Sequence, residues 1–468
     1  MGGEIFSLPV KSVSSSSVHD TSHNFGGGLA STTMNPIVLV AILLCVGLTF
    51  GLPRKYAILP ILAGIFTIPL GQSVYILGVH WLGYRIIVMG GLARVLVARR
   101  ALFPDGLSPI DRAFIGSAIC QSIAFVLQYM VTDALVNQFA FLIDFAGAYI
   151  VLRGLLQTEA DVYRALRLLA GICLILGTTM FIEQRTLTNV FGLLGGTRLV
   201  PEIREGKIRS QGVFSHSITA GVFGGTLLVP FILLWRNTRS RFMAAVGIVG
   251  CTLITICSNS STPLLAYAAG IFGAGLWPLR RHMRELRRGF AVVLVCLHLV
   301  MKAPVWFLIA RVDLTGSSSG YHRAELVDQA VNHFSEWWLI GTKDTGRWGS
   351  DIWDLQNQFV AVAVTGGLLA LVLFIKSISR TFGMLGSTRK AVAGNRRREL
   401  TTWLLGCTLF AHVVASFGVN YFDQSKVGMF LAFAMTSAIA IPMGSRGPTP
   451  GSSEHAPRVS EQWFEFAH

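Results

Sequence analysis

The cationic side chains that could bind an anion are concentrated in two polar stretches of an otherwise apolar chain. The first stretch, residues 184–212, contains Arg185, Arg198, Arg204, Lys207 and Arg209. Arg209 lies three residues before Gly212–Phe214, where an apolar segment begins, and a helix starting there would add backbone amides to the guanidinium. Guanidinium groups bind phosphate oxygens in bidentate fashion, so this stretch predicts a site for a phosphate-containing anion. Alternatively, the arginines pair with the neighbouring glutamates, which are Glu183, Glu202 and Glu205.

The second stretch, residues 310–356, adds a further cation on a predicted helix. Residues 321–334 have a helical pattern with an apolar stripe made of Val327, Ala330, Val331 and Phe334. Arg323 lies four residues before Val327, so it would project from the same packed face near the helix start. A buried guanidinium requires a partner, which is either an anionic ligand or a carboxylate in a structural salt bridge.

Aromatic and hydroxyl-binding side chains follow in the same stretch. It contains Trp337, Trp338, Trp348 and Trp353, near Asp344, Asp351, Asp354 and Asn357. Tryptophan anchors proteins at membrane interfaces, which accounts for some of these residues. Flat aromatic rings also stack on the faces of sugars, so a hydroxyl-rich ligand is the second interpretation.

The elements that position these residues are membrane-spanning helices. The chain has 468 residues, of which 52% are hydrophobic and 13% charged, whereas soluble proteins carry about 25% charged residues. We therefore expect an all-α polytopic membrane protein with about 12–13 transmembrane helices. The predicted spans are approximately 35–52, 56–71, 73–97, 113–132, 134–155, 165–183, 213–235, 242–258, 261–278, 289–309, 357–376, 401–418 and 425–443.

Charge in the connections predicts the orientation. Arginine and lysine clusters fall in alternate connections, which the positive-inside rule assigns to the cytoplasm, and the two polar stretches 184–212 and 310–356 then become outer loops. Residues 1–34 are expected to be a disordered tail, 35–443 the membrane domain and 444–468 a cytoplasmic tail. The net charge of +15 belongs to these connections, so we expect contact with the lipid bilayer and no binding of nucleic acid.

Ionisable and cysteine residues within the spans have structural interpretations. Arg85 and Asp144 lie in different predicted spans, and a charge inside a bilayer needs a partner, so we predict that they pair. Lys302 lies toward the outer half of its span and could extend into the outer site. The seven cysteines all lie in apolar segments, so neither a zinc cluster nor a disulfide is expected.

Three passages resemble the superfamily of O-antigen ligases and O-antigen polymerases of bacterial envelopes. They are IRSQGVFSHSITAGVFGG at 208–225, STPLLAYAAG at 261–270, and RAELVDQAVNHFSEWWLIGT followed by DLQNQFVAVAVTGGLLALVLF within 323–374. Their order and spacing on a multi-span chain carry the resemblance, which covers roughly residues 35–443. It implies a GT-C-like fold in the bacterial inner membrane, with the active site on the periplasmic face.

The resemblance also implies an activity. The family transfers a glycan from a polyprenyl diphosphate carrier to a sugar hydroxyl without a metal or other cofactor, in O-antigen or exopolysaccharide assembly. The implied partners are the polyprenyl diphosphate-linked oligosaccharide, the glycan acceptor and other polysaccharide-assembly proteins. Arg209 and Arg323 would hold the diphosphate and stabilise its developing charge, assisted by Lys302, Arg204 or Arg311.

The acceptor side of the expected site departs from the family pattern. Ligases have a His-Asn pair where this chain has Gln356–Asn357, and a glutamine cannot accept a proton at neutral pH. Asp354 or Glu325 would then act as the base, with His322 as a further candidate, or the hydroxyl is only oriented. This departure favours a polymerase over a ligase. Two other functions stay open, a flippase for lipid-linked sugars or another multi-span transporter, and a non-catalytic assembly partner.

Overall fold

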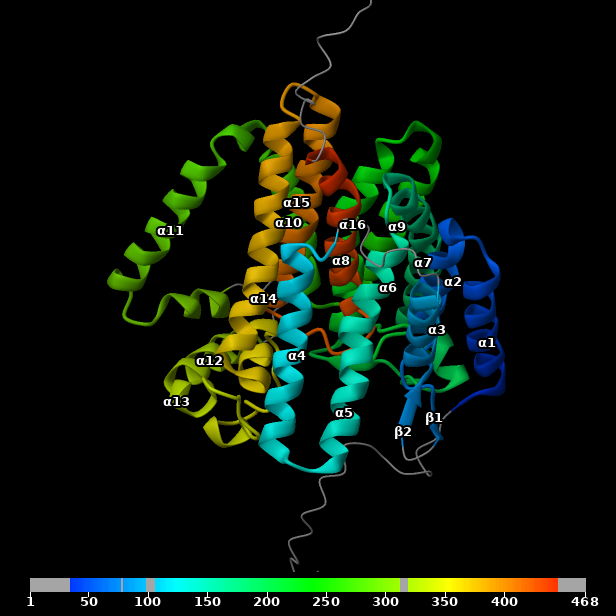
Figure 1. Ribbon diagram of the computed structural model, residues 1–468. Helices are drawn as coiled ribbons and strands as arrows, with labels where there is room; N and C mark the ends of the chain where they lie inside the picture. The colour runs from blue at the N-terminus through cyan, green and yellow to red at the C-terminus, as the bar shows by residue number, and fades with distance from the viewer. Residues whose placement is uncertain (1–33, 77–78, 98–105, 312–318, 445–468) are drawn as a thin grey trace, which may run out of the picture.

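The computed structural model describes residues 34–76, 79–97, 106–311 and 319–444, which are predominantly helical with two short β-hairpins (Figure 1). The predicted tails, 1–34 and 444–468, lie almost entirely outside these residues. The hairpins pair β1 (Ser73–Ile76) with β2 (Val79–Leu82) and β3 (Glu202–Arg204) with β4 (Lys207–Arg209). The helices are α1 (Pro36–Gly51), α2 (Arg54–Thr67), α3 (Gly83–Val97), α4 (Pro109–Tyr129), α5 (Thr132–Leu142), α6 (Ala148–Leu155), α7 (Glu159–Thr186), α8 (Ser217–Trp235), α9 (Arg241–Cys257), α10 (Ser261–Gly275), α11 (Met283–Val300), α12 (Ser319–Asn332), α13 (Phe334–Trp337), α14 (Gln358–Ala391), α15 (Arg396–Ser416) and α16 (Lys426–Gly444).

Seven helical segments are long and apolar enough to cross a membrane, which makes this a multi-pass membrane protein, as the sequence predicts. An eighth would be α11 if it forms one span with the 3-10 helix Val305–Arg311, from which it is bent by 94°. These are fewer than the predicted spans, because α1, α2, α3 and α10 contain only 14 to 16 residues. The seven segments are Pro109–Tyr129, Thr132–Leu155, Glu159–Thr186, Ser217–Trp235, Thr238–Cys257, Gln358–Ala391 and Arg396–Ser416.

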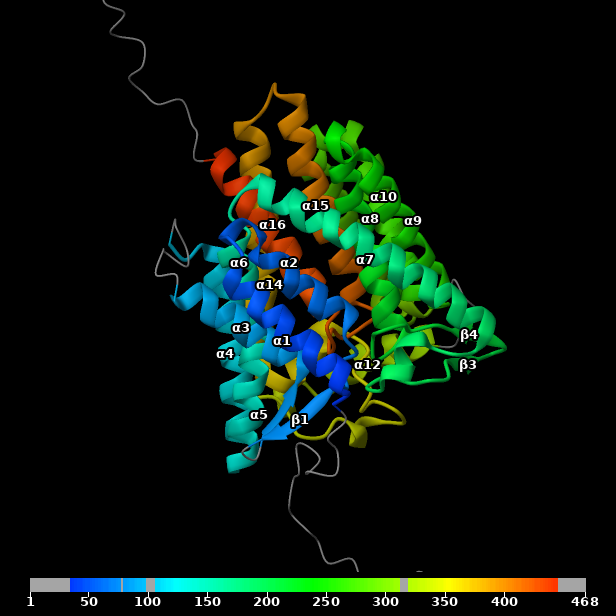
Figure 2. The same ribbon diagram turned by 90° about the vertical axis from the view of Figure 1, so that its right-hand side faces the viewer.

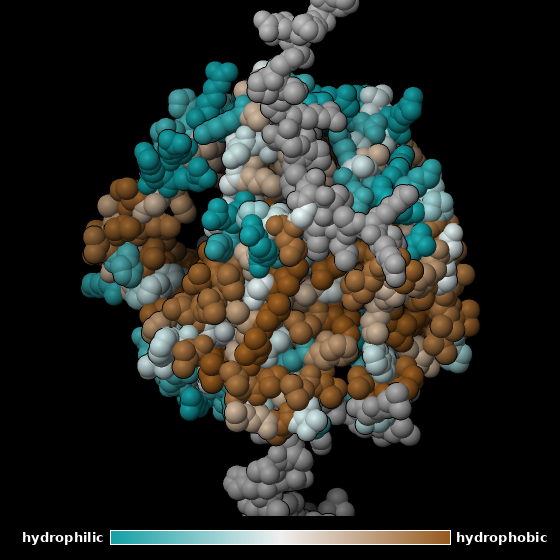
Figure 3. Space-filling view, viewed as in Figure 1, coloured by the Kyte–Doolittle hydropathy of each residue, from teal (hydrophilic) through white to brown (hydrophobic). Residues whose placement is uncertain are grey.

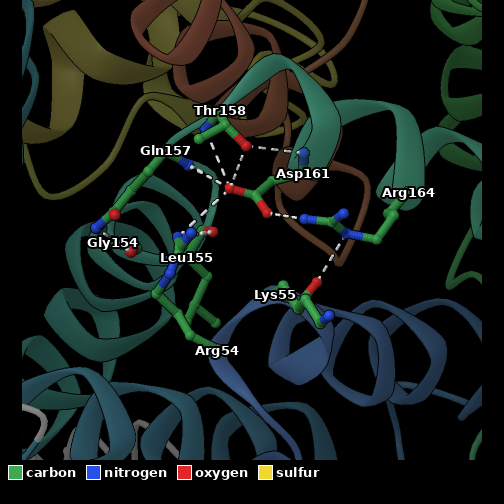
Figure 4. A network of polar contacts seen from close by, with 8 residues as sticks. All are labelled: Arg54, Lys55, Gly154, Leu155, Gln157, Thr158, Asp161 and Arg164. Atoms are coloured by element: carbon green, nitrogen blue, oxygen red, sulfur yellow. Dashed lines mark hydrogen bonds and ion pairs between the residues drawn. The ribbon is translucent and has the colours of Figure 1, made fainter.

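The start of α7 shows how local sequence signals position a helix. The Thr158 side chain caps α7 by accepting from the Asp161 amide, and the Asp161 carboxylate accepts from the Thr158 amide at 3.0 Å, which forms a capping box (Figure 4). The Asp161 carboxylate also accepts from Arg164 and, at 3.4 Å, from Arg54 at the start of α2. One buried carboxylate therefore links the α6–α7 turn to α2.

The predicted span 73–97 is only partly correct, because its first third forms the hairpin of β1 and β2. Val74 pairs with Trp81, and Tyr75 pairs with His80 across the antiparallel register. β-Branched and aromatic residues favour strands, and their apolar character makes such a hairpin look like helix in a hydropathy profile. As a result α3 begins at Gly83, so Arg85 lies in its first turn and not near the middle of a span.

The predicted pair between Arg85 and Asp144 is confirmed. Nε and Nη2 of Arg85 donate to the two carboxylate oxygens of Asp144 at 3.0 and 2.7 Å. Asp144 lies in a π-helical turn, Ile143–Gly147, that joins α5 to α6. Both side chains are largely buried, so this bidentate pair neutralises two charges inside the bundle.

A kink in α14 attaches the second predicted outer loop to the bundle. Gly367 has φ +75 inside this helix, a conformation that favours glycine. Two backbone hydrogen bonds join α14 to the loop at this kink. The Leu368 amide donates to the Trp338 carbonyl at 2.8 Å, and the Thr342 amide donates to the Val364 carbonyl at 2.7 Å. The loop that carries Arg323 is therefore fixed to a spanning helix.

The two ends of the bundle differ in composition. Figure 1 places α12, α13 and β1–β2 at one end and the α14–α15 turn at the other, and Figure 2 places β3 and β4 at the same end as α12. The α8–α9, α10–α11 and α14–α15 connections, which carry the arginine clusters, lie at the end opposite α12. Apolar side chains cover the middle of the face in Figure 3. Helix α11 leans away from the bundle (Figure 1).

Candidate functional site

The two predicted outer loops meet at one cavity of about 400 Å³. We call it the arginine cavity. Its lining comes from four connections and the helix starts beside them, namely α7–α8, α9–α10, α11–α14 and α15–α16. The polar and charged lining residues are Glu202, Arg204, Arg209, His216, Ser260, Arg323, Asp354, Gln356 and Asn420.

Arg204 and Arg209 reach the cavity from the β3–β4 hairpin. Its tip, Glu205 and Gly206, has φ values of +52 and +73, the conformation of a tight two-residue turn between antiparallel strands. The register pairs Glu202 with Arg209. The Asn259 side chain donates to the Ile208 carbonyl at 2.6 Å, which anchors β4 at the end of α9.

Arg209 makes the glutamate pairing that was the alternative interpretation of the sequence. Its Nη1 lies 3.4 Å from each carboxylate oxygen of Glu202, so it does pair with a glutamate of its own stretch. The side chain is only 12% exposed, and its buried Nε has no hydrogen-bond partner among the described residues. Burial lowers the pKa of the Arg209 guanidinium and the Glu202 charge opposes that shift. An arginine stays protonated at neutral pH, so Arg209 keeps a full charge and unused hydrogen-bonding capacity.

Arg323 comes from α12 and is 4% exposed, as its predicted burial requires. The predicted apolar stripe is half correct: Ala330 is buried and Val327 packs against the same cluster, whereas Val331 is 51% exposed and Phe334 lies beyond the end of α12. The buried face runs through Arg323, Leu326 and Ala330, so it is shifted toward Leu326 relative to the prediction. Leu326 and Ala330 pack in a small apolar cluster with Trp337, Trp348, Ile352 and α14 residues, which holds α12 against the bundle.

Asp354 and Gln356 form the acidic and amide part of the lining. The Gln356 Nε2 donates to the Asp354 carboxylate at 2.5 Å. The His322 ring lies 3.1 Å from the Asp354 carbonyl, so α12 also contacts this turn. A carboxylate held by one amide keeps further lone pairs for a hydroxyl donor.

The α15–α16 connection belongs to the site, although sequence reasoning did not select it. Asn420 and Phe422 line the cavity, and Asp423 ties the connection to α8 by accepting from Thr219 Oγ1 at 2.6 Å and from the Ser215 amide at 3.3 Å. This segment is short and lacks an arginine, so no charge cluster drew attention to it.

His216 is a second lining residue that sequence reasoning missed. It occupies the residue before α8, is exposed to the cavity, and places its ring 5.7 Å from that of Phe422 in an edge-on arrangement. An imidazole can accept a proton near neutral pH. The only signal in the sequence was its position in the passage that contains Arg209.

Five of the predicted site residues do not line the cavity. Lys302 is exposed at the bend after α11, and Arg311 is exposed at the end of the 3-10 helix. Asn357 is buried and caps α14 by accepting from the Phe359 amide at 2.9 Å, which is a structural role. His322 and Glu325 lie on α12 but outside the lining.

The four tryptophans of the second loop differ in their surroundings, and Trp338 is exposed outside the cavity. Trp337 and Trp348 are buried in the cluster beneath α12, and Trp348 Nε1 donates to Glu336 at 3.0 Å. Trp353 is 70% exposed and lines the arginine cavity. Within the described ranges, no group of three or more His, Cys, Asp or Glu side chains is placed to hold a metal ion.

The cavity is rich in charged groups. Three guanidinium groups from two separate loops share it with two carboxylates, those of Glu202 and Asp354, and one imidazole. No protein-family model matches the chain, and no curated protein matches it either. The functional argument therefore depends on this geometry.

Proposed function

We propose that this protein is a metal-independent membrane glycosyltransferase that moves a glycan from a polyprenyl diphosphate carrier to a sugar hydroxyl. The observation that carries the proposal is the convergence of Arg204, Arg209 and Arg323 on one cavity at the end of the bundle away from the basic connections. A carrier diphosphate in a membrane presents its phosphate oxygens close to the lipid headgroups. Fixed guanidinium groups from two loops match that charge.

The reaction assigns a role to each part of the cavity. The acceptor oxygen attacks the anomeric carbon, and the bond from that carbon to the diphosphate oxygen breaks, so the carrier diphosphate leaves with the electron pair. Arg209 and Arg323 stabilise the negative charge that develops on it, and Arg204 assists. Asp354 or His216 takes the acceptor proton, while Gln356 orients the hydroxyl or the carboxylate.

We also propose a location and a complete topology. If the arginine-rich connections lie in the cytoplasm, the arginine cavity opens on the outer face of a bacterial inner membrane. The shorter helices α1, α2, α3, α10 and α16, with the bent α11, then complete the 12 or 13 spans of a GT-C-like fold.

The capping role of Asn357 bears on whether the protein is an O-antigen ligase or a polymerase. In this chain the Gln356–Asn357 pair supplies one lining residue and one buried helix cap. Neither side chain is a base at neutral pH. We therefore propose a polysaccharide polymerase ahead of a ligase.

The test uses the full chain in liposomes with a polyprenyl diphosphate-linked oligosaccharide, following release of free carrier diphosphate and product length. Release with lengthening chains supports a polymerase, and release with one transfer per acceptor supports a ligase. Arg323→Ala should abolish release while the protein still inserts. The matched control is Arg347→Ala, an exposed arginine of the same loop that pairs with Glu336.

Two outcomes would contradict the proposal. Normal product from Arg323→Ala would remove the anion site from the mechanism. Movement of the intact donor across the bilayer, with its carrier bond unbroken, would identify a flippase instead.

A further inference from the structure

A second cavity, of about 200 Å³, adjoins the arginine cavity. Its walls are the outer end of α4 with Phe125 and Tyr129, the segment 342–345 after α13, and Thr365 of α14. Trp353 and Leu355 line both cavities, so they form the partition between them. The two cavities are therefore neighbouring parts of one surface.

The chemistry of this second cavity differs from that of the arginine cavity. Three aromatic rings line it, where the arginine cavity has its guanidinium groups: the ring centroids of Phe125 and Tyr129 are 4.6 Å apart, and Trp353 is 70% exposed. Among the described residues, Lys343 and Asp344 are the charged members of its lining, and the Lys343 amine lies 5.3 Å from the Tyr129 ring. One charge of each sign does not select a diphosphate, so the ligand of this cavity should be close to neutral.

Its backbone frame is already held in place by hydrogen bonds. The side-chain Nε2 of Gln128 donates to the Thr365 carbonyl at 3.2 Å and links α4 to α14. Thr345 Oγ1 donates to the Ile352 carbonyl at 3.0 Å, and the Asp344 carboxylate accepts from the Gly346 amide at 2.8 Å. A frame that needs no ordering on binding favours affinity for a small ligand.

We propose that this second cavity binds the non-reducing end of a neutral carbohydrate, which serves as the acceptor of the transfer reaction. A pyranose ring has an apolar face of C–H groups that packs on an aromatic ring and a rim of hydroxyls for polar partners. Phe125, Tyr129 and Trp353 supply the rings, while Thr342 and Asp344 supply polar partners. The acceptor role rests on the proposed function, whereas carbohydrate binding rests on the cavity alone.

The shared partition explains why the acceptor would lie here. A sugar stacked beside Trp353 lies next to Asp354, the candidate proton acceptor of the arginine cavity. Its terminal hydroxyl can then reach past Trp353 into the arginine cavity, toward a donor whose diphosphate is held by Arg209 and Arg323. Donor and acceptor thus enter separate cavities and meet at their boundary.

The binding test uses the full chain in nanodiscs and an array of carrier-free oligosaccharides released from bacterial surface polysaccharides. We expect wild type to bind at least one glycan, and Trp353→Ala and Tyr129→Ala to weaken that binding about tenfold or more. Trp353→Phe should keep part of the affinity, because a ring remains. The matched control is Trp235→Ala, an exposed tryptophan at the far end of α8, which should bind as wild type does.

Two results would overturn the carbohydrate site. One is wild type that binds no glycan on the array, and the other is unchanged binding by both Trp353→Ala and Tyr129→Ala. A tryptophan that only anchors the membrane interface would give the second result.

The transfer assay separates this proposal from the proposed function. An acceptor site predicts that Trp353→Ala raises the acceptor KM more than the donor KM, and equal changes would overturn the acceptor role. Glycan binding that depends on Trp353, without release of carrier diphosphate from any donor, would refute the transferase and keep the carbohydrate site. Release of carrier diphosphate that depends on Arg323, together with glycan binding that Trp353→Ala does not change, would keep the transferase and refute the carbohydrate site.

Discussion

Arg85 and Arg209 are both largely withdrawn from water, and their partners distinguish a structural charge from one that can bind a ligand. Arg85 makes two bonds to Asp144, of 3.0 and 2.7 Å, and a third to the His80 carbonyl at 2.6 Å. Arg209 has only the 3.4 Å contacts with Glu202, and its Nε has no partner among the described residues. Arg85 is therefore satisfied within the fold, whereas Arg209 can still bind an anion.

The Arg85–Asp144 pair should stabilise the fold only when both side chains are present. Either Arg85→Ala or Asp144→Ala leaves one buried charge without its partner, so each should lower the free energy of unfolding by about 3 kcal/mol. The double variant removes both charges and should lose less than the sum of the two single variants. Thermal unfolding of the nanodisc-embedded protein measures this, and additive losses would show that the two side chains are not coupled.

Glu202 competes with any anion for Arg209, so removing its charge should strengthen anion binding. We expect Glu202→Gln to increase the affinity for inorganic diphosphate about two- to fivefold, the range of a partly exposed ion pair. Titration of the purified protein with diphosphate measures it. Glu205→Gln, at the exposed tip of the same hairpin, is the matched control. An equal gain in both variants would indicate a general charge effect without competition at Arg209.

Sequence could select some residues of the arginine cavity because their types are unusual for their place. Arg204, Arg209 and Arg323 stood out as arginines in predicted outer loops, and all three line the cavity. His216 and Asn420 escaped notice, because only the approach of α8 to the α15–α16 connection makes them neighbours. Lys302 and Arg311 were misplaced because the 94° bend after α11 is not visible in hydropathy.

At the scale of elements, the kink in α14 determines where the second predicted outer loop meets the bundle. A Cβ at Gly367 would lie 2.4 Å from the Leu339 carbonyl oxygen, and its φ of +75 disfavours a side chain. We therefore expect Gly367→Ala to displace the loop, to weaken diphosphate binding and to lower thermal stability. Gly383→Ala in the same helix, where a Cβ meets nothing within 4 Å, is the control. Equal behaviour of the two variants would show that the junction does not position the loop.

The helices themselves were largely predictable, since twenty-residue apolar runs have few structures available in a bilayer. Predicted spans 134–155, 213–235 and 242–258 agree closely with the observed segments. The hairpin at 73–82 was not predictable from hydropathy, because its apolar residues suit a strand and a helix equally. The burial of Leu326 on α12 was also missed, since it depends on Trp337 and Trp348, which follow α12 in the chain.

At the scale of the whole molecule, the arrangement of charge predicts an orientation that labelling can test. In a background without the native cysteines, Ser350→Cys on the second outer loop should react with a membrane-impermeant maleimide in spheroplasts. Ala393→Cys, exposed in the α14–α15 connection, should react only after permeabilisation. The reverse pattern would place the arginine cavity in the cytoplasm and contradict the proposed topology.

The lining of the arginine cavity comes from connections between helices and from the helix starts beside them, and it shares only a few residues, such as Val419, with the apolar core of the bundle. Substitutions in those connections can therefore change the ligand without disturbing the contacts that hold the helices together. If the ligand changes between species, the cavity can diverge quickly on a slowly changing scaffold. Related proteins should then share the pattern of spans long after their cavity residues have stopped resembling one another.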